Sequence, residues 1–536
     1  MESFADNLQI MRRTPLSESH VEALRSIATE HVWDPGHVVT RAGAPMTRFV
    51  YVLSGAIEVF DDRTGEAYLE AFLGPQQFAG EIALLTGSAA ALSLRTREVT
   101  KVLVADRQDL LKLMSKIPEM SDIIISVLAA RRRRQVEMGD SNLCLIGAEA
   151  SRDVRQIEAF LSRNKLPFRA LTLDDPDAPQ LCGGTAAPGV VFGDDGLMSD
   201  PSPRAVARRL GLDQTALDCA QTDVLIVGGG PGGVAAAVYA GAEGLRSVLV
   251  EELAVGGQAG TSSRIENYMG FPTGISGGDL VWRGQVQAMK FGTQFVRPRR
   301  IDALIEQDDG RIEAHLEDGH KIMARAVVIA TGVQYRRLPW GRLEDFEGAG
   351  VYYAATETEA RYTAGDEVIV VGGGNSAGQA AMFISRTAKH VHVFVRGTSL
   401  AASMSDYLSS RLAADPAITL HFETQIEALD GDCTLECVRY RTPQGLHECP
   451  ARGVFVMVGA APNTNWLPSC VKLDPRGYVI TGEEVGGRSQ FETSHHGIYA
   501  VGDVRAGSVK RVASAVGEGS VVISDVWSHV RGDVGD

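Results

Sequence analysis

Short apolar runs alternate with turn-forming residues between Val32 and Val104, as in residues 48–55 (RFVYVLSG), 57–62 (IEVFDD) and 101–106 (KVLVAD). That spacing predicts an all-β barrel or sandwich. A helical pattern follows from Arg107 to Met138 and ends in the basic run 131–134. We expect this run to be the solvated end of a helix, because cations suit the C-terminal end of the helix dipole. A binding patch is the alternative.

A second region begins at Leu143, where strand and helix patterns alternate. The predicted order is a strand at 143–147, a helix at 154–165, strands at 168–173 and 189–193, and a helix at 203–212. This alternation is typical of a small α/β unit. The polar stretch from Asp213 to Thr222 is expected to be a linker.

The third region, from Asp223 onward, contains two glycine-rich strand–loop–helix units. In the first, the apolar strand Val224–Val227 leads into Gly228, Gly230 and Gly233, and a second strand ends at Glu251. The first glycine makes the turn, the second lets backbone approach a pyrophosphate, and the third lets helix pack on strand. Glu251 also stands at the position whose carboxylate accepts hydrogen bonds from ribose hydroxyls. The sequence therefore predicts a dinucleotide site.

The second unit places Gly372, Gly374 and Ala377 at the same spacing. Its second strand, Val391–Val395, ends at Arg396 and carries no acid. An arginine at this position suits a 2′-phosphate, so NADPH is expected rather than NADH. A solvated surface arginine is the alternative.

Charge, apolar runs and cysteines limit the possible partners and compartment. The formal net charge of −15 disfavours nucleic acid and anionic membrane as main partners. No uncharged apolar run is long enough for a membrane helix, and the first residues lack a secretory pattern. The seven cysteines are dispersed, and none forms a Cys-x-x-Cys pair. We therefore expect a reduced cytoplasmic protein without a disulfide framework or a metal site.

Further motifs make the third region, Asp223 to Val530, resemble a low-molecular-weight thioredoxin reductase. They are 256–258 (GGQ), 265–268 (IENY), 330–332 (ATG), 453–456 (GVFV) with Gly459 and 462–464 (PNT), 497–503 (GIYAVGD) and 511–513 (RVA). The resemblance implies a split FAD domain with an inserted NADPH domain, a homodimer, and rotation of the NADPH domain. The implied FAD residues are Gly228, Gly230, Pro231, Gly233, Glu251, Gly257, Gln258, Asn267, Thr331, Gly332, Gly502, Asp503, Arg511, Val512 and Ala513. The implied NADPH residues are Gly372, Gly374, Asn375, Ser376, Ala377 and Arg396.

One departure from the family pattern concerns the redox centre. Thioredoxin reductases place Cys-x-x-Cys just before the second glycine loop, and here Ala354 and Glu357 occupy those positions. A disulfide cannot form there. Glu357 becomes a candidate for proton handling beside the flavin, and Arg396 is followed by Gly397 rather than by the second basic residue often found in the family.

The N-terminal regions resemble two other families. Residues 78–87 (FAGEIALLTG) are similar to the phosphate-binding cassette of cyclic-nucleotide-binding domains, with Glu81 at the ribose position. The arginine that would pair with the cyclic phosphate is expected near position 90, where this chain has Ala90. The next arginine, Arg95, comes later than expected. A β-barrel kept for docking or dimer assembly is the favoured interpretation. The second region resembles a glutaredoxin or thioredoxin unit, with Pro188 at the cis-proline place, but 147–153 (GAEASRD) lacks the redox cysteine.

We therefore predict a multidomain chain. Residues 1–139 form the cyclic-nucleotide-binding-like β-barrel with helices, and 140–215 the thioredoxin-like α/β domain. Residues 221–335 with 452–536 form the FAD domain, and 336–451 the NADPH domain. The leading hypothesis is an NADPH oxidoreductase that passes electrons from FAD to an unidentified acceptor, such as a small redox protein. The alternatives are a thioredoxin-disulfide reductase using other thiols, such as Cys433 and Cys437, and a redox-sensing regulatory flavoprotein.

Overall fold

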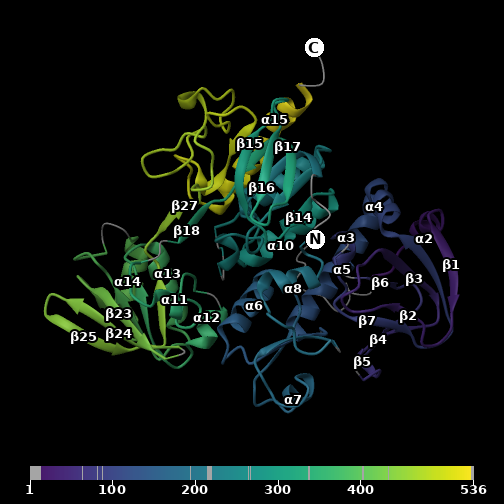
Figure 1. Cartoon of the computed structure of the whole chain (residues 1–536), viewed down its shortest axis with the longest axis horizontal. Helices are drawn as coiled ribbons and strands as arrows, with labels where there is room; N and C mark the ends of the chain where they lie inside the picture. Colours follow the sequence, from purple (N-terminus) through teal and green to yellow (C-terminus); the bar gives the residue numbers. More distant parts are fainter. Residues whose placement is uncertain are drawn as a thin grey trace.

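Four units follow one another along the chain (Figure 1). The computed structural model describes residues 14–532 except 63, 81, 87, 140, 194, 214–219, 263–264, 266, 336–337, 356, 401–403 and 433. Glu81, Glu266 and Cys433 therefore lie outside the described residues. The small blue α/β unit lies between the purple N-terminal β domain and the green domain that carries the second glycine loop (Figure 1).

The N-terminal β domain contains two four-stranded sheets, as the alternating pattern predicts. One sheet has the order β1-β8-β3-β6 and the other β2-β7-β4-β5. Their bounds are β1 Ala28–Trp33, β2 Val38–Thr40, β3 Arg48–Ser54, β4 Ile57–Phe60, β5 Ala67–Leu73, β6 Phe78–Ala79, β7 Ser93–Thr96 and β8 Thr100–Asp106. The helices are α2 Glu18–Arg25, α3 Ala83–Thr86, α4 Arg107–Lys116 and α5 Pro118–Met138.

The helical region after β8 differs from its prediction in two ways. The expected single helix is divided at Pro118, which has no backbone N–H and begins α5. The basic run is not simply solvated: Arg131 donates to the carbonyl of Phe78 at 2.6 Å, and Arg132 is only 6% exposed. The prediction of a solvated helix end is wrong for these two residues, because α5 packs its last turns against neighbouring segments.

The small α/β unit, residues 141–213, contains a three-stranded sheet of order β10-β9-β11. Strands β9 (Leu143–Ile146) and β10 (Arg169–Leu171) are parallel, and β11 (Gly189–Phe192) is antiparallel to β9. The helices are α6 Arg152–Arg163, α7 Ala178–Leu181 and α8 Pro203–Arg209. Pro188 precedes β11, but its peptide bond is not cis; among the described residues the cis bond is Arg297–Pro298. Sequence alone does not fix the isomer of this bond, and in the structure the bond before Pro188 is trans.

The seven-stranded domain carries the first glycine loop. Its sheet has the order β14-β13-β12-β17-β16-β15, and β28 pairs with β17. The strands are β12 Ala220–Val227, β13 Ser247–Val250, β14 Gln294–Val296, β15 Ile301–Glu306, β16 Ile312–Leu316, β17 Lys321–Ile329 and β28 Ile498–Ala500. The helices α9 Pro231–Ala242, α10 Gly277–Lys290 and α15 Val512–Gly532 accompany it, with α9 packed on α15.

The five-stranded domain carries the second glycine loop on a sheet of order β19-β26-β20-β21-β22, beside the three-stranded sheet β23-β24-β25. The strands are β19 Val351–Tyr352, β20 Glu367–Val371, β21 His390–Phe394, β22 Ile418–His421, β23 Gln425–Gly431, β24 Leu435–Thr442, β25 Gly445–Pro450 and β26 Gly453–Val456. The helices are α11 Leu343–Phe346, α12 Glu357–Tyr362, α13 Asn375–Ile384 and α14 Asp406–Ala414.

The connection between these two domains corrects one predicted boundary. The sequence predicts the return to the first domain at residue 452, but β26 pairs with β20 in the five-stranded sheet. The chain returns afterwards, where β27 (Ala460–Pro462) pairs with β18 (Val333–Tyr335) in a two-stranded link. Strand β26 is apolar and buried on both faces, so either parallel sheet suits its composition, and only its pairing decides between them.

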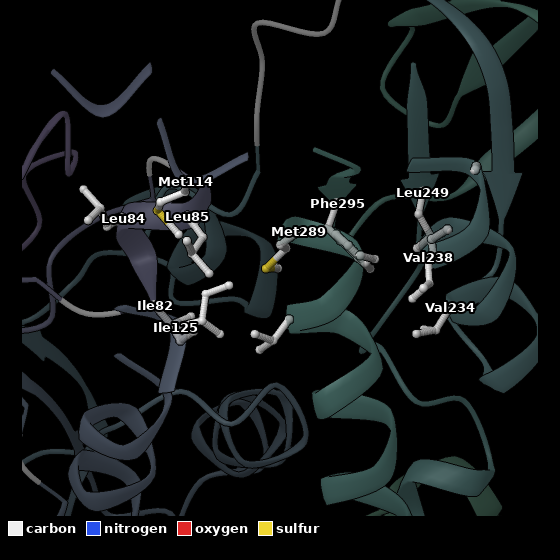
Figure 2. Close-up of a cluster of buried hydrophobic side chains, with 14 of the residues drawn as sticks. Ile82, Leu84, Leu85, Met114, Ile125, Val234, Val238, Leu249, Met289 and Phe295 are labelled. Atoms are coloured by element: carbon white, nitrogen blue, oxygen red, sulfur yellow. The ribbon is translucent and has the colours of Figure 1, made fainter. Parts of the chain in front are cut away.

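One hydrophobic core runs from the N-terminal β domain into the seven-stranded domain. It includes Leu84, Leu85 and Ile125 of the former, and Val234 and Leu249 of the latter. Figure 2 shows Met289 of α10 between the two groups. Because a shared apolar core holds two units far more firmly than scattered polar contacts do, we infer that these two units form one packed body.

Candidate functional site

The first glycine loop makes the sharp turn that its spacing predicts. Gly228 has a φ of +106°, and a Cβ there would lie 2.4 Å from the carbonyl oxygen of Ala330. A Cβ on Gly233 would lie 1.9 Å from the carbonyl oxygen of Gly228, so α9 can approach the strand only with glycine there. A Cβ on Gly230 would meet nothing within 4 Å. The loop is thus closed toward the sheet and open in front of Gly230.

Helix α9 begins at Pro231, directly behind this open space. Its N-cap is Gly230, and no side chain caps it. The first-turn backbone N–H groups of an uncapped helix attract anions, because they lack partners within the helix and lie at the positive end of its dipole. The geometry therefore fits a pyrophosphate.

Glu251 closes one side of the loop. Its carboxylate accepts hydrogen bonds from the backbone N–H groups of Gly229 at 2.6 Å and Leu253 at 2.9 Å. Burial raises the pKa of Glu251, while these two amides and that of Ala254 oppose the shift. With one bond to each oxygen, the carboxylate keeps further lone pairs for ribose hydroxyls.

Three more predicted segments meet at this end of the sheet. Gln258 donates from Nε2 to the carbonyl of Val333 at 2.6 Å, and Thr331 donates from Oγ1 to the carbonyl of Asn463 at 2.9 Å. A Cβ on Gly257 (φ +52°) would lie 3.1 Å from the Cα of Gly230. These contacts bring together segments on both sides of the inserted five-stranded domain.

The segment Gly502–Asp503 is held by a residue that sequence reasoning missed. Glu518 of α15 accepts from the backbone N–H of Gly502 at 2.6 Å and forms an ion pair with Arg505 at 2.8 Å. Burial raises the pKa of Asp503. A glutamate in the otherwise small and apolar stretch 512–523 was the one available signal for Glu518.

The remaining predicted FAD residues lie at the edge of the loop cluster. Val512 and Ala513 begin α15, and Arg511 precedes it and is exposed. Gly332 follows Thr331 with a φ of +59°. Asn267 is exposed, and within the described part of the chain its side chain makes no hydrogen bond. The structure therefore brings the glycine loop, Glu251, Gln258, Thr331 and Gly502 together but does not tie Asn267 to them.

The second glycine loop repeats the design of the first. Gly372 has a φ of +147°, a Cβ there would lie 2.4 Å from the carbonyl oxygen of Met457, and Ala377 is fully buried. Helix α13 starts after Gly374 without a side-chain cap, and its first residues, Asn375 and Ser376, are exposed. The Oδ1 atom of Asn375 accepts from the N–H of Ser405 at 2.9 Å. An open anion site is again formed.

Arg396 lies just past the end of β21 and is exposed. Among the described residues, no hydrogen bond or ion pair involves its guanidinium group. The side chain is therefore available to a ligand phosphate.

The two positions that correspond to the family cysteines lie in the connection after β19 and at the start of α12. Ala354 is 7% exposed, and Glu357 is the first residue of α12. Helix α12 contacts the small α/β unit, because the hydroxyl of Tyr362 donates to the carboxylate of Glu158. Arg155 of the same unit donates to the carbonyl of Gly348, in the turn before β19, at 3.3 Å. The segment thus lies beside a neighbouring unit of the same chain.

One set of potential metal ligands occurs among the described residues, although the sequence predicted no metal site. Donor atoms of Glu367, His392 and Cys449 lie within 4.8 Å of one another. The carboxylate of Glu367 already forms an ion pair with Lys389 at 3.0 Å. Burial raises the pKa of the Cys449 thiol to about 11, which disfavours the thiolate that metals bind.

Two glycine loops, each joining a strand of a parallel pair to an uncapped helix, are typical of an oxidoreductase that uses two dinucleotides. The profile of the pyridine nucleotide-disulphide oxidoreductases matches residues 222–519, and the chain belongs to that family. It is 31% identical over 311 residues to the thioredoxin reductase of Treponema pallidum, covering 58% of this chain and 97% of that protein. It is also 31% identical over 316 residues to NADPH-dependent thioredoxin reductase 3 of Arabidopsis thaliana, covering 56% of each chain.

Solved structures agree with this assignment. The thioredoxin reductase of Lactococcus lactis in the FR conformation matches with a TM-score of 0.52 at 26% identity, over 58% of this chain and 99% of that one. The T. acidophilum thioredoxin reductase matches with a TM-score of 0.52 at 28% identity, over 59% and 99%. Enzymes of this family use FAD and NADPH, and the chain is an oxidoreductase of the thioredoxin reductase family.

The N-terminal β domain also matches a known family. The profile of cyclic nucleotide-binding domains covers residues 30–117. The guanidinium of Arg95, which comes later than the expected cassette arginine, pairs with Glu58 at 2.7 Å. In the described part of the chain, no helix is both long and apolar enough to cross a membrane.

Proposed function

We propose that this protein is an FAD-dependent NADPH oxidoreductase that works without the dithiol of its relatives. One observation carries this proposal: the chain keeps both uncapped glycine-loop helices, whereas Ala354 and Glu357 stand where the family has its cysteine pair. When bound, FAD would supply the two-electron centre between NADPH and an acceptor. Glutathione-like or thioredoxin-like disulfides are then not reduced through residues 354 and 357.

The residues around the first loop would bind and orient the FAD. The loop from Gly228 to Gly230 and the first turn of α9, which includes Gly233, would present backbone N–H groups to the pyrophosphate. Pro231, which has no N–H, would fix the start of the helix, and Glu251 would accept from the ribose. By resemblance, Gly257, Gln258, Asn267, Thr331 and Gly332 surround the isoalloxazine end, Gly502 and Asp503 lie near the ribityl chain, and Arg511, Val512 and Ala513 meet the pyrimidine ring. Gly372, Gly374, Asn375, Ser376, Ala377 and Arg396 would bind NADPH.

Anaerobic titration of the purified protein with NADPH, followed by flavin absorbance, tests the missing dithiol. Full bleaching after about one equivalent is expected, because two electrons then fill the sole centre. A requirement for about two equivalents would reveal a second centre, such as a cysteine pair. A flavin that NADPH does not reduce would overturn the proposal.

Glu357 is proposed to handle a proton during reoxidation. The Glu357→Gln variant should then reoxidise more slowly, by about tenfold or more, because general acid–base groups typically contribute at least that much. Flavin reduction by NADPH should be unchanged in the same stopped-flow series. If the Glu357→Gln variant and the wild-type protein reoxidise at the same rate at every pH tested, Glu357 has no part in the mechanism.

A regulatory flavoprotein is a second candidate, favoured by the core that joins the N-terminal β domain to the seven-stranded domain. Such a core can transmit a change between the two units, since packed interfaces shift as bodies rather than deform continuously. Very low NADPH consumption with every acceptor, together with redox-dependent assembly, would support it.

We further propose a cytoplasmic homodimer whose acceptor is a small redox protein.

A further inference from the structure

A cavity of about 40 Å³ lies where three units of the chain meet. Ala89 and Ala91 of the N-terminal β domain, Asn164 of the small α/β unit, and Gln285 and Arg297 of the seven-stranded domain are among its lining residues. The side chain of Asn164 is fixed by donating to the carbonyls of Phe160 at 2.9 Å and Leu253 at 3.2 Å. Side chains of all three units therefore form the wall of the cavity.

The charged groups that line this cavity are cations. They are Arg132, Lys165 and Arg297. Lys165 also lies 4.0 Å from the carboxylate of Asp279, which is not among the lining residues. Arg297 is 7% exposed, and its buried Nη1 atom has no hydrogen-bond partner. Burial and the nearby charge of Arg132 lower the pKa of Arg297 to about 10, so it stays charged at neutral pH. The carboxylate of Glu251 opposes this shift, but it does not supply an acceptor for Nη1. A buried N–H group without an acceptor is costly, and an anion in the cavity would relieve that cost.

The position of the cavity relates to the missing cassette arginine. Ala89 and Ala91 flank Ala90, the position at which that arginine is absent, and both line the cavity. Arg132 comes instead from α5, and Arg297 from the segment after β14. Cations from two other parts of the chain thus converge beside the cassette.

We propose that this cavity binds a small oxyanion of the size of phosphate, which joins the N-terminal units to the seven-stranded domain through Arg132, Lys165 and Arg297. Each enclosed water needs about 10–15 Å³ by this measure, so the cavity has room for about three waters. A tetrahedral oxyanion fits such a space, whereas a whole cyclic nucleotide is several times larger. The site lies next to the FAD loop, since Glu251 donates its N–H to the carbonyl of Val296 at 2.9 Å.

Thermal unfolding of the FAD-loaded full chain tests this site. Sodium phosphate should raise the Tm saturably above that in sodium chloride of equal ionic strength, because a ligand that binds only the folded state stabilises it. The holoprotein is used so that phosphate cannot bind at the FAD pyrophosphate loop. Isothermal titration calorimetry with phosphate then gives the Kd of the wild-type protein.

Matched arginine variants locate the effect. Arg297→Gln should weaken phosphate binding at least tenfold, and its Tm in chloride should equal or exceed that of the wild type. Arg132→Gln should also weaken binding. Arg133→Gln is the control, because Arg133 is on the same helix but pairs with Glu137 at 2.8 Å, and it should bind phosphate as the wild type does.

Three results would overturn the proposal. The first is a holoprotein whose Tm does not respond to phosphate or sulfate. The second is stabilisation by cyclic AMP or cyclic GMP but not by phosphate, which would assign the cations to an opened nucleotide site. The third is equal phosphate affinity in the Arg297→Gln and wild-type proteins.

Discussion

At the scale of single residues, steric exclusion explains why the glycine loops have so little freedom. Gly228 and Gly372 each have positive φ, and each would bring a Cβ to 2.4 Å from the carbonyl oxygen of the residue that follows a neighbouring strand. The same reason does not apply to Gly230, which faces open space. Two kinds of glycine thus serve one site: some let backbone pack on backbone, and others leave room for the ligand.

Gly233→Ala should disrupt the FAD loop. Its Cβ would lie 1.9 Å from the carbonyl oxygen of Gly228, so the loop must shift, at a cost of about 1–3 kcal/mol. We expect a lower flavin-to-protein absorbance ratio and a lower free energy of unfolding. Gly517→Ala is the control: its Cβ meets nothing within 4 Å on helix α15, and alanine there should stabilise by up to about 1 kcal/mol. Full flavin content in Gly233→Ala would contradict this account.

Cys449 should be unreactive near neutral pH. Burial raises the pKa of its thiol to about 11, so at pH 8 on the order of one thiol in a thousand is ionised. Thiol labelling with a disulfide reagent, mapped by mass spectrometry, should modify the exposed Cys470 quickly and Cys449 only as the pH approaches its pKa. Rapid labelling of Cys449 at pH 8 would instead make it a candidate for the alternative thiol-based activity.

At the scale of elements, helix α15 positions parts of the FAD site, although it lies far from the first glycine loop in the sequence. It packs on α9 so closely that a Cβ on Gly519 would lie 2.1 Å from the carbonyl oxygen of Gly232. This contact places Glu518 where it accepts from Gly502 and Arg505. The last helix therefore holds both the start of α9 and the Gly502–Asp503 segment.

Glu518→Gln should weaken FAD binding without unfolding the protein. The variant loses the charge that binds Arg505, a kind of bond worth about 1.5–3 kcal/mol, so the Kd for FAD should rise by about tenfold or more. Flavin fluorescence on dilution measures that Kd, and circular dichroism checks the fold. Glu243→Gln, at the exposed end of α9, should bind FAD normally. An unchanged Kd in Glu518→Gln would deny Glu518 its positioning role.

At the scale of the whole molecule, the small α/β unit links the other domains. Buried Asp213, at the start of the predicted linker, pairs with buried Arg299 and lies 3.5 Å from Arg204. On the opposite side, Tyr362 of the five-stranded domain donates to Glu158. A five-stranded domain that must rotate during turnover, as the family resemblance implies, would have to break this second contact.

Tyr362→Phe should therefore increase turnover. Loss of one hydrogen bond, worth about 0.5–1.5 kcal/mol, should raise the rate with an artificial acceptor by about two- to tenfold if rotation limits it. Steady-state kinetics measures the overall turnover, and stopped-flow absorbance measures flavin reduction by NADPH separately. Tyr407→Phe is the control, because Tyr407 is exposed and contacts Arg411 within its own helix. Equal rates in both variants would mean that this contact does not limit rotation.

The local parts of the site were predictable, and the distant ones were not. The turns at Gly228 and Gly372 and the place of Glu251 follow from spacing within about 30 residues, the length of one strand–helix–strand unit. Glu518, Asn463 and the contact of Tyr362 with Glu158 join segments far apart in the chain. Arg131 and Arg132 were misplaced for the same reason, since burial depends on what packs against α5.

The sequence by itself determined the fold class, the two nucleotide-binding units and the absence of a Cys-x-x-Cys pair, because these depend on residue identity and short-range spacing. Only the tertiary structure decided that β26 belongs to the five-stranded sheet, that one core joins the N-terminal β domain to the seven-stranded domain, and that Arg132 and Arg297 meet in one cavity. Strand pairing and side-chain burial are properties of contacts between remote segments, and local pattern does not specify which remote segment supplies the partner.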